Sequence, residues 1–297
     1  MKTPAALFAL ALASVATLTA ADPLKELSAA SEAIPTTPSP RIKRVGIQPA
    51  PSVSPAAKPA ATPAPYRPAV RRDGRRVVAL DIGHTAAQQG AYSARGRGEF
   101  LFNKDIVEAL SARLRDHPQI APFIINPEGI PISLPMRTAL AAKNGAELFL
   151  AIHHDSAQDK YFSAWEFEGK PQRFSDDFHG YGVFVSDKNR QPARSLVFGK
   201  LLGAEMAKAG FEFSPHHAEP VRGENRAIID NDRGVYRYND LIVLKTAPMP
   251  AALLECGVIA NREEEARLRD PATHGRIVES IVAAIERFFA SEPAAPR

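Results

Sequence analysis

The 297-residue chain has a single cysteine, Cys256, so no disulfide can form within it. Small exported domains often rely on disulfides for stability, and this chain must instead be stabilised by a hydrophobic core of ordinary size. The chain also lacks long hydrophobic runs: residues 5–18 are apolar, but this stretch is shorter than the roughly 18 residues that span a bilayer. No transmembrane segment is therefore expected in the mature protein.

The first residues nevertheless have a recognisable pattern, MKTPAALFALALASVATLTAAD. Lys2 provides a positive start, the apolar stretch follows, and Thr19-Ala20-Ala21 supplies small residues for cleavage. This order is typical of a secretory signal peptide, predicted here over residues 1–21. A short membrane anchor is the alternative, and its length disfavours it.

A composition change marks the next segment, residues 22–75. Ten prolines fall within residues 35–68, mixed with Ala, Ser and Thr and without apolar periodicity. Such a composition predicts a Pro/Ala-rich disordered linker rather than a second folded module. The folded domain is then expected over residues 76–290, followed by a short tail, 291–297.

The folded part also lacks a net positive charge. Residues 22–75 carry nine Lys/Arg and four Asp/Glu, and Lys2 adds one more positive charge. Because the whole chain is +4, residues 76–297 are left with about −2. The basic pI belongs to the linker, which argues against nucleic acid as a partner of the domain.

Strand-like and helix-like segments alternate through the predicted domain. Strands are expected at 77–83, 121–126, 147–153, 180–186, 241–245 and 251–257, and helices at 100–114, 133–145, about 191–209 and 277–289. This alternation predicts an α/β fold: a three-layer, phosphorylase/hydrolase-like arrangement with a twisted, mostly parallel sheet and helices on both faces. Ligands gather at the carboxyl ends of the strands in such folds.

Polar side chains that bind metals stand at those strand ends. They are Asp81 and His84 at the end of the first strand, His153, His154 and Asp155 at the end of the third, Glu255 at the end of the last, and Glu99 just before the first helix. Two imidazoles and a carboxylate are a usual set for catalytic zinc, which keeps one position open. A further carboxylate could transfer protons. Spacing alone leaves both this hydrolase centre and a purely structural role for the histidines open.

Several linked motifs resemble one family, the zinc-dependent N-acetylmuramoyl-L-alanine amidases of the bacterial cell wall. That family has a strand ending like DPGHGG, a glutamate that begins the first helix, a strand ending like SIHAN or SIHAD, and a late PAVLVE segment. This chain has VVALDIGH, GEFLFNKDI, FLAIHHDS and PMPAALLECG in the same order, within roughly residues 76–290. Ile82 and Thr85-Ala86 depart from the first motif without removing a ligand position.

The resemblance implies a role for each matching residue. His84, Glu99 and His153 correspond to the ligands of one Zn²⁺, and Glu255 to the catalytic glutamate. His154 stands where the family has a small residue, and neighbouring strand residues point to opposite faces. His154 is therefore expected to support a ligand side chain from outside the metal site or to face the substrate. Asp155 is expected to orient a ligand imidazole or to cap the turn.

Two further segments are candidates for contacts with substrate. Residues 157–179 form a long connection whose aromatic residues, Trp165 among them, either line a groove or pack on one another. Residues 213–240 precede the last strands, where some family members carry a helix that blocks the zinc. Pro and Gly interrupt this segment, so no long blocking helix is expected, although His217, Glu219 and Arg233 could reach the site.

The sequence thus predicts an exported zinc hydrolase, with the periplasm as the expected location. It would act on peptidoglycan and cleave the amide bond between N-acetylmuramic acid and L-alanine. A protein activator could regulate it. Two alternatives stay open. One is another zinc peptidoglycan hydrolase, a carboxypeptidase or endopeptidase. The other is a wall-binding regulator on a degenerate amidase fold, which the presence of all four site positions disfavours.

Overall fold

The structure, a computed structural model, describes residues 66–68 and 73–291. The predicted signal peptide, most of the predicted linker and residues 292–297 lie outside the described residues. The described residues belong to one compact unit, Thr62–Arg297. No helix among them combines the length and apolar character needed to cross a bilayer.

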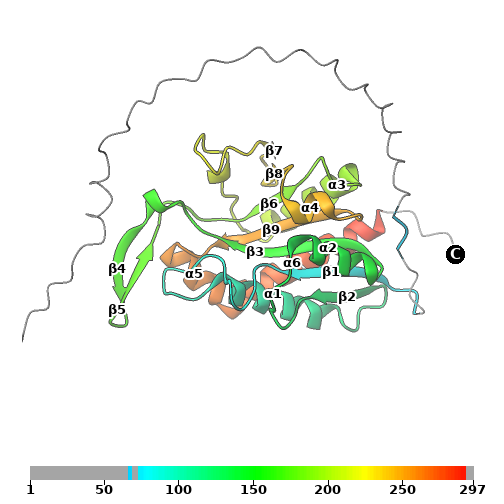
Figure 1. The fold of residues 1–297 in the computed structure, drawn as a ribbon, viewed down its shortest axis with the longest axis horizontal. Helices are drawn as coiled ribbons and strands as arrows, with labels where there is room; N and C mark the ends of the chain where they lie inside the picture. The colour runs from blue at the N-terminus through cyan, green and yellow to red at the C-terminus, as the bar shows by residue number, and fades with distance from the viewer. Residues whose placement is uncertain (1–65, 69–72, 292–297) are drawn as a thin grey trace, which may run out of the picture. The chain divides into compact units, whose positions relative to one another are not determined.

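A seven-stranded mixed sheet forms the centre of this unit, in the order β2-β1-β3-β9-β6-β8-β7 (Figure 1). Its strands are β1 (Arg76–Ile82), β2 (Ile120–Ile125), β3 (Ala146–Asp155), β6 (Gly182–Val185), β7 (Ile228–Asp230), β8 (Val235–Arg237) and β9 (Ala251–Val258). The four strands β2, β1, β3 and β9 are parallel to one another, whereas β6 runs antiparallel to β9. The prediction of a mostly parallel sheet is confirmed.

Helices cover both faces of the sheet because its inner strands are apolar on both sides. The helices are α1 (Glu99–Leu114), α2 (Leu134–Lys143), α3 (Pro192–Lys208), α4 (Ile242–Thr246), α5 (Arg262–Arg269) and α6 (Pro271–Ala290). Alternate residues of each strand point to opposite faces: Leu148 and Leu150 belong to one hydrophobic cluster, and Phe149 and Ala151 to the other.

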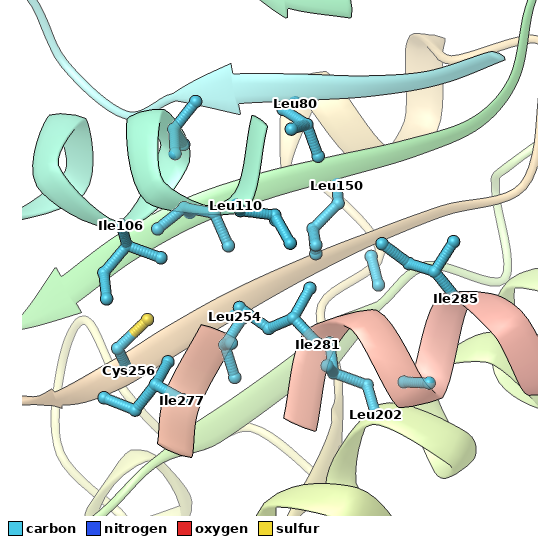
Figure 2. Packing of buried hydrophobic residues seen from close by; sticks show 14 of the residues in the cluster. Leu80, Ile106, Leu110, Leu150, Leu202, Leu254, Cys256, Ile277, Ile281 and Ile285 are labelled. Atoms are coloured by element: carbon cyan, nitrogen blue, oxygen red, sulfur yellow. The ribbon is translucent and has the colours of Figure 1, made fainter. Parts of the chain in front are cut away.

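The first cluster is the larger and lies between the sheet and helices α1, α3 and α6. Figure 2 shows Leu80, Leu150 and Leu254 of three neighbouring strands facing Leu110 of α1 and Ile281 of α6. Each of these side chains is fully buried, and burying one such side chain is worth about 1.5–3 kcal/mol. This core fixes α1, and with it the position of Glu99 at the start of the helix.

One predicted strand is wrong. Residues 241–245, LIVLK, instead form the N-cap, Leu241, and most of the short helix α4. A five-residue apolar run fits a buried strand or one helical turn equally well. Here Leu241 accepts the backbone N–H groups of Leu244 and Lys245, and Val243 and Leu244 complete the second hydrophobic cluster.

The long connection 157–179 contains a β-hairpin that the sequence analysis did not predict. Strands β4 (Ser163–Phe167) and β5 (Lys170–Phe174) pair with each other and stand apart from the large sheet (Figure 1). Glu168 and Gly169 both have positive φ, 52° and 73°, as a two-residue hairpin turn requires. On the hairpin, Trp165 stacks on Phe167, with ring centroids 5.5 Å apart.

Tyr66, within the predicted linker, packs against the folded unit. Its hydroxyl donates to the carbonyl of Ala146 at 2.9 Å, and its ring joins the second hydrophobic cluster. Ordered packing thus begins before Arg76, the first residue of β1.

Candidate metal centre

Three parallel strands bring the candidate site together at one edge of the sheet. His84 follows β1, His153 lies near the end of β3, and Glu255 lies in β9 directly opposite His153 in the strand register. Glu99 begins α1 and approaches the same edge. Since parallel strands end side by side, His84 and Glu255 come to the same edge of the sheet although 171 positions separate them in the chain.

His84, Glu99 and His153 are close enough to bind one metal ion, since one ligand atom from each lies within 4.8 Å of the others. Glu99 is central: Oε2 lies 2.9 Å from Nε2 of His84, and Oε1 lies 2.9 Å from Nδ1 of His153. Burial alone would raise the pKa of Glu99, but the two imidazoles hold that pKa well below its usual value. Glu99 is thus a carboxylate, the form that binds metals.

Two glycines make room for this cluster. A Cβ on Gly83 would lie 2.5 Å from the ring of His153, and a Cβ on Gly90 would lie 2.4 Å from Oε2 of Glu99. Gly90 also has φ +75°, a conformation that side chains disfavour. Both glycines thus allow the backbone to approach the three ligand side chains, as a metal site requires.

His154 turns away from the cluster, as the alternation along β3 predicts. Its side chain is buried on the α1 side of the sheet, where Nδ1 lies 2.8 Å from Oδ1 of Asn103. Burial lowers the pKa of His154 to about 3, so the ring is neutral. Asn103 also donates to Oε1 of Glu99 at 3.2 Å, and His154 therefore supports Glu99 through Asn103.

One carboxyl oxygen of Glu255 is not used in holding the described part of the fold together. Its Oε2 is buried and finds no hydrogen-bond partner among the described residues. Burial, and then the carboxylates of Asp155, Glu99 and Glu224, raise the pKa of Glu255 well above its ordinary value. A metal cation or a substrate proton beside this carboxyl would satisfy it.

Arg137 supports His84, a role that the sequence analysis missed. The guanidinium is buried and donates to Oδ1 of Asp81 at 2.7 Å, to the carbonyl of Ile82 at 2.6 Å and to the carbonyl of His84. His84 has φ 67°, a left-handed conformation that costs about 1–3 kcal/mol in a residue other than glycine. The bonds from Arg137 hold the backbone in that conformation.

We expect Arg137→Ala to lower the free energy of unfolding by about 3–5 kcal/mol, because it leaves Asp81 buried without its partner. Burial already raises the pKa of Asp81, and the guanidinium opposes that rise. Urea unfolding measures the change. Arg113→Ala removes an exposed ion pair with Glu279 and is the control, with a much smaller effect. Equal losses in the two variants would contradict the role of Arg137.

A second group of potential ligands lies beyond the first along β3. Asp155 contacts His216 and His217, both in the short 3₁₀ helix η2 (His216–Ala218), and does not orient His84 or His153. His216 was not singled out from the sequence, although the adjacent pair in FSPHHAEP was visible there. No α-helix occurs within residues 213–240, so the prediction of no long blocking helix is confirmed.

The remaining candidates from the sequence have other partners. Glu219 accepts a hydrogen bond from the hydroxyl of Tyr161 at 3.0 Å. Arg233 pairs with Asp230 at 2.9 Å on an exposed turn. Trp165 donates through Nε1 to the carbonyl of Ala94 at 2.9 Å and so joins the hairpin to the loop before α1.

A cavity of about 570 Å³ lies between this hairpin and the loop before α1. Its lining residues are Tyr92, Ser93, Ser156, Ala157, Asp159, Phe162, Ala164, Pro171, Gln172 and Arg173. Ser156 directly follows β3, and Tyr92 is two residues from Gly90, which packs on His84 and Glu99. Two of its lining residues are thus close in sequence to residues of the metal cluster.

Comparison with known proteins agrees with this architecture. Residues 78–287 match the family model described as N-acetylmuramoyl-L-alanine amidase. The chain is 27% identical over 248 residues to the N-acetylmuramoyl-L-alanine amidase AmiC of Escherichia coli O6:H1, with 74% of this chain and 54% of AmiC covered. It is 23% identical over 231 residues to the probable amidase AmiB of Haemophilus influenzae, with 72% and 52% covered. The chain thus spans about half the length of these two relatives.

The fold is shared with solved structures. The amidase Ami1 of Mycobacterium smegmatis superposes with a TM-score of 0.58 at 19% sequence identity, over 73% of this chain and 98% of Ami1. At this identity the likeness shows the fold alone.

Proposed function

Because the chain belongs to the N-acetylmuramoyl-L-alanine amidase family, we propose that it hydrolyses the amide bond between the lactyl group of N-acetylmuramic acid and L-alanine in peptidoglycan. The observation that carries this proposal is the convergence of His84, Glu99 and His153 beside the buried carboxyl of Glu255. Three ligands and a separate proton-transferring carboxylate are what metal-assisted amide hydrolysis needs.

The donor set fits zinc. Two imidazole nitrogens and one carboxylate oxygen match the ligands of catalytic zinc sites, which leave a position open for water or substrate. His84, Glu99 and His153 would hold the ion. A zinc ion bound there supplies Lewis acidity, which polarises a carbonyl and makes water a better nucleophile at neutral pH.

Glu255 is proposed to move the proton during hydrolysis. Its carboxyl shares the face and the edge of the sheet with His153, and Oε2 has no competing hydrogen bond among the described residues. This oxygen would accept a proton from the attacking water and return it to the alanine nitrogen as the amide bond breaks. The raised pKa of Glu255 suits a group that holds the proton between these two steps.

The test of this function is product analysis by mass spectrometry. Incubating the protein with purified peptidoglycan should release peptides that begin with a free L-alanine amine and leave the glycan intact. A chelator should abolish the release, and added Zn²⁺ should restore it. Products cut within the stem peptide would replace the amidase with a zinc peptidase, and no products despite bound metal would indicate a wall-binding regulator.

We propose that the cavity lined by Tyr92 and Phe162 holds part of the substrate. Tyr92 is 59% exposed and follows Ala91, whose backbone N–H donates to Oε2 of Glu99 at 3.1 Å, so its ring is available for stacking on a sugar or packing on a peptide. We expect Tyr92→Ala to raise KM several-fold with kcat largely retained. Val197→Ala changes an exposed residue on α3 that does not line the cavity and is the control. Unchanged KM in Tyr92→Ala would place the substrate elsewhere.

We also propose that the protein is exported to the periplasm, where such a substrate lies. Support comes from the sequence of residues 1–21, which lie outside the described part of the structure. Mass spectrometry of the protein from fractionated cells would show a mature N-terminus at residue 21 or 22. An intact Met1 in the cytoplasmic fraction would contradict export.

A further inference from the structure

A second cluster of metal-binding side chains lies outside the proposed zinc site. Oδ2 of Asp155 is 2.9 Å from Nε2 of His216 and 2.6 Å from Nε2 of His217. All three side chains are largely buried, with exposed fractions of 15%, 5% and 12%. The three ligand atoms lie within 4.8 Å of one another, and their chemistry, two imidazoles and one carboxylate, repeats that of the first cluster.

In both rings the nitrogen that does not face Asp155, Nδ1, has a partner of its own. Nδ1 of His217 lies 2.7 Å from Oε2 of Glu224, and Nδ1 of His216 lies 2.8 Å from Oγ of Ser214. A carboxylate only accepts hydrogen bonds, so Nδ1 of His217 carries the proton. This arrangement, in which the far nitrogen donates to a carboxylate and the near nitrogen faces the ligand group, is common to histidines that bind metals.

The nitrogen of His217 that faces Asp155, Nε2, is not explained by a hydrogen bond. Nε2 of His217 is buried and has no hydrogen-bond partner among the described residues, although Oδ2 of Asp155 is only 2.6 Å away. The second oxygen of Asp155, Oδ1, already accepts the backbone N–H of Ser156 at 2.7 Å. Oδ2 is therefore left facing two imidazole nitrogens, at ion-pair distance but outside hydrogen-bonding geometry for His217.

We propose that Oδ2 of Asp155 and Nε2 of His216 and His217 form a second metal site, which takes a divalent transition-metal ion such as Zn²⁺. A cation at their centre would satisfy the buried Nε2 of His217, for which the described residues supply no hydrogen bond. Imidazole and carboxylate together suit zinc and its neighbours in the first transition series better than Mg²⁺ or Ca²⁺, which prefer oxygen ligands.

The position of the site gives it a structural role. Asp155 ends β3, whereas both histidines belong to η2 in the segment before β7. That segment also bonds to the connection that follows β3: Gln158 Nε2 donates to the carbonyl of Arg222 at 3.1 Å, and the hydroxyl of Tyr161 donates to Glu219 at 3.0 Å. A metal ion would attach residues 214–224 to the end of β3, beside Glu255. The site does not depend on the proposed amidase activity.

The competing state has no metal. Burial lowers the pKa of His217, but Asp155 and Glu224 outweigh it and raise that pKa to about 9. A protonated His217 between two carboxylates would then occupy the same position. The two states differ in metal content, which can be counted directly.

The test is metal stoichiometry of the full chain after loading with excess Zn²⁺ and dialysis, measured by inductively coupled plasma mass spectrometry. We expect two zinc ions per chain in the wild type and one in His216→Gln, in His217→Gln and in His84→Gln. His179→Gln changes an exposed histidine that pairs with Glu212 and should retain two. Titration of the wild type with Co²⁺, followed by visible absorption, should saturate at two equivalents and needs no variant to fold.

The experiment distinguishes absence of the second metal site from absence of the proposed zinc site. One zinc per chain that His84→Gln loses and the η2 variants retain, with Co²⁺ saturating at one equivalent, would overturn the second site and favour the protonated His217. One zinc that the η2 variants lose and His84→Gln retains would overturn the zinc site of the proposed amidase instead.

Discussion

Glu255→Gln is expected to lower the rate of peptidoglycan hydrolysis by about 10²–10⁴-fold, the usual contribution of a general acid–base group. The amide keeps the shape of the carboxyl but cannot accept the proton of the attacking water. Because Glu255 is not among the three clustered ligands, the variant should bind as much zinc as the wild type. Release of peptides with a free L-alanine amine measures the rate, and elemental analysis measures the zinc.

Glu279→Gln is the matched control for this change. Glu279 lies on the exposed face of α6, where it pairs with Arg113 at 2.7 Å, and its substitution should leave the rate within about twofold. A Glu255→Gln variant that hydrolyses peptidoglycan at nearly the normal rate would remove Glu255 from the chemistry. Loss of zinc from that variant would make Glu255 a ligand rather than a proton carrier.

The second large effect is expected from Glu99→Gln. Glu99 bridges His84 and His153 through its two oxygens, and it is the only anionic ligand of the proposed zinc. The amide has one oxygen acceptor and no charge, so zinc should bind more than about 100-fold more weakly, since even outer partners of zinc ligands contribute 10–100-fold. Zinc titration measures the affinity, and hydrolysis should fall to background with it.

Glu108→Gln, on the same helix, controls for a change of charge on α1. Glu108 is exposed and lies 3.6 Å from Lys104, far from any ligand in the fold. This variant should bind zinc and hydrolyse peptidoglycan as the wild type does. If Glu99→Gln kept zinc at wild-type affinity, the ion would lie elsewhere and the ligand assignment would be wrong.

The central elements were predictable because their patterns are local. The run VVALDIG gave β1, and Ser133 and Gly145 bounded α2: Ser133 accepts the N–H of Met136, and Gly145 has φ 71°. Short segments were harder, since LIVLK fits a strand or one helical turn. The hairpin β4–β5 had a turn signal at Glu168-Gly169, but its strands are half exposed and weakly apolar.

The site was less accessible to sequence reasoning because its parts meet only in the folded chain. His84, Glu99, His153 and Glu255 were noted from their places near predicted strand and helix ends and received roles through resemblance to a family, and the structure brings them to one edge of the sheet. Arg137 lies on α2, 56 residues after Asp81, and no local pattern pairs the two. His216 likewise gains meaning only when η2 meets the end of β3.

The hydrogen bond of Tyr66 has a consequence for orientation. Tyr66 attaches at Ala146, the first residue of β3, whereas His153 and Asp155 lie at the other end of that strand. Ten residues of strand extend about 30 Å. If residues before Tyr66 held the protein in place, the end of β3 that carries His153 and Asp155 would point away from the point of attachment. The candidate metal centre would then lie about 30 Å from that point.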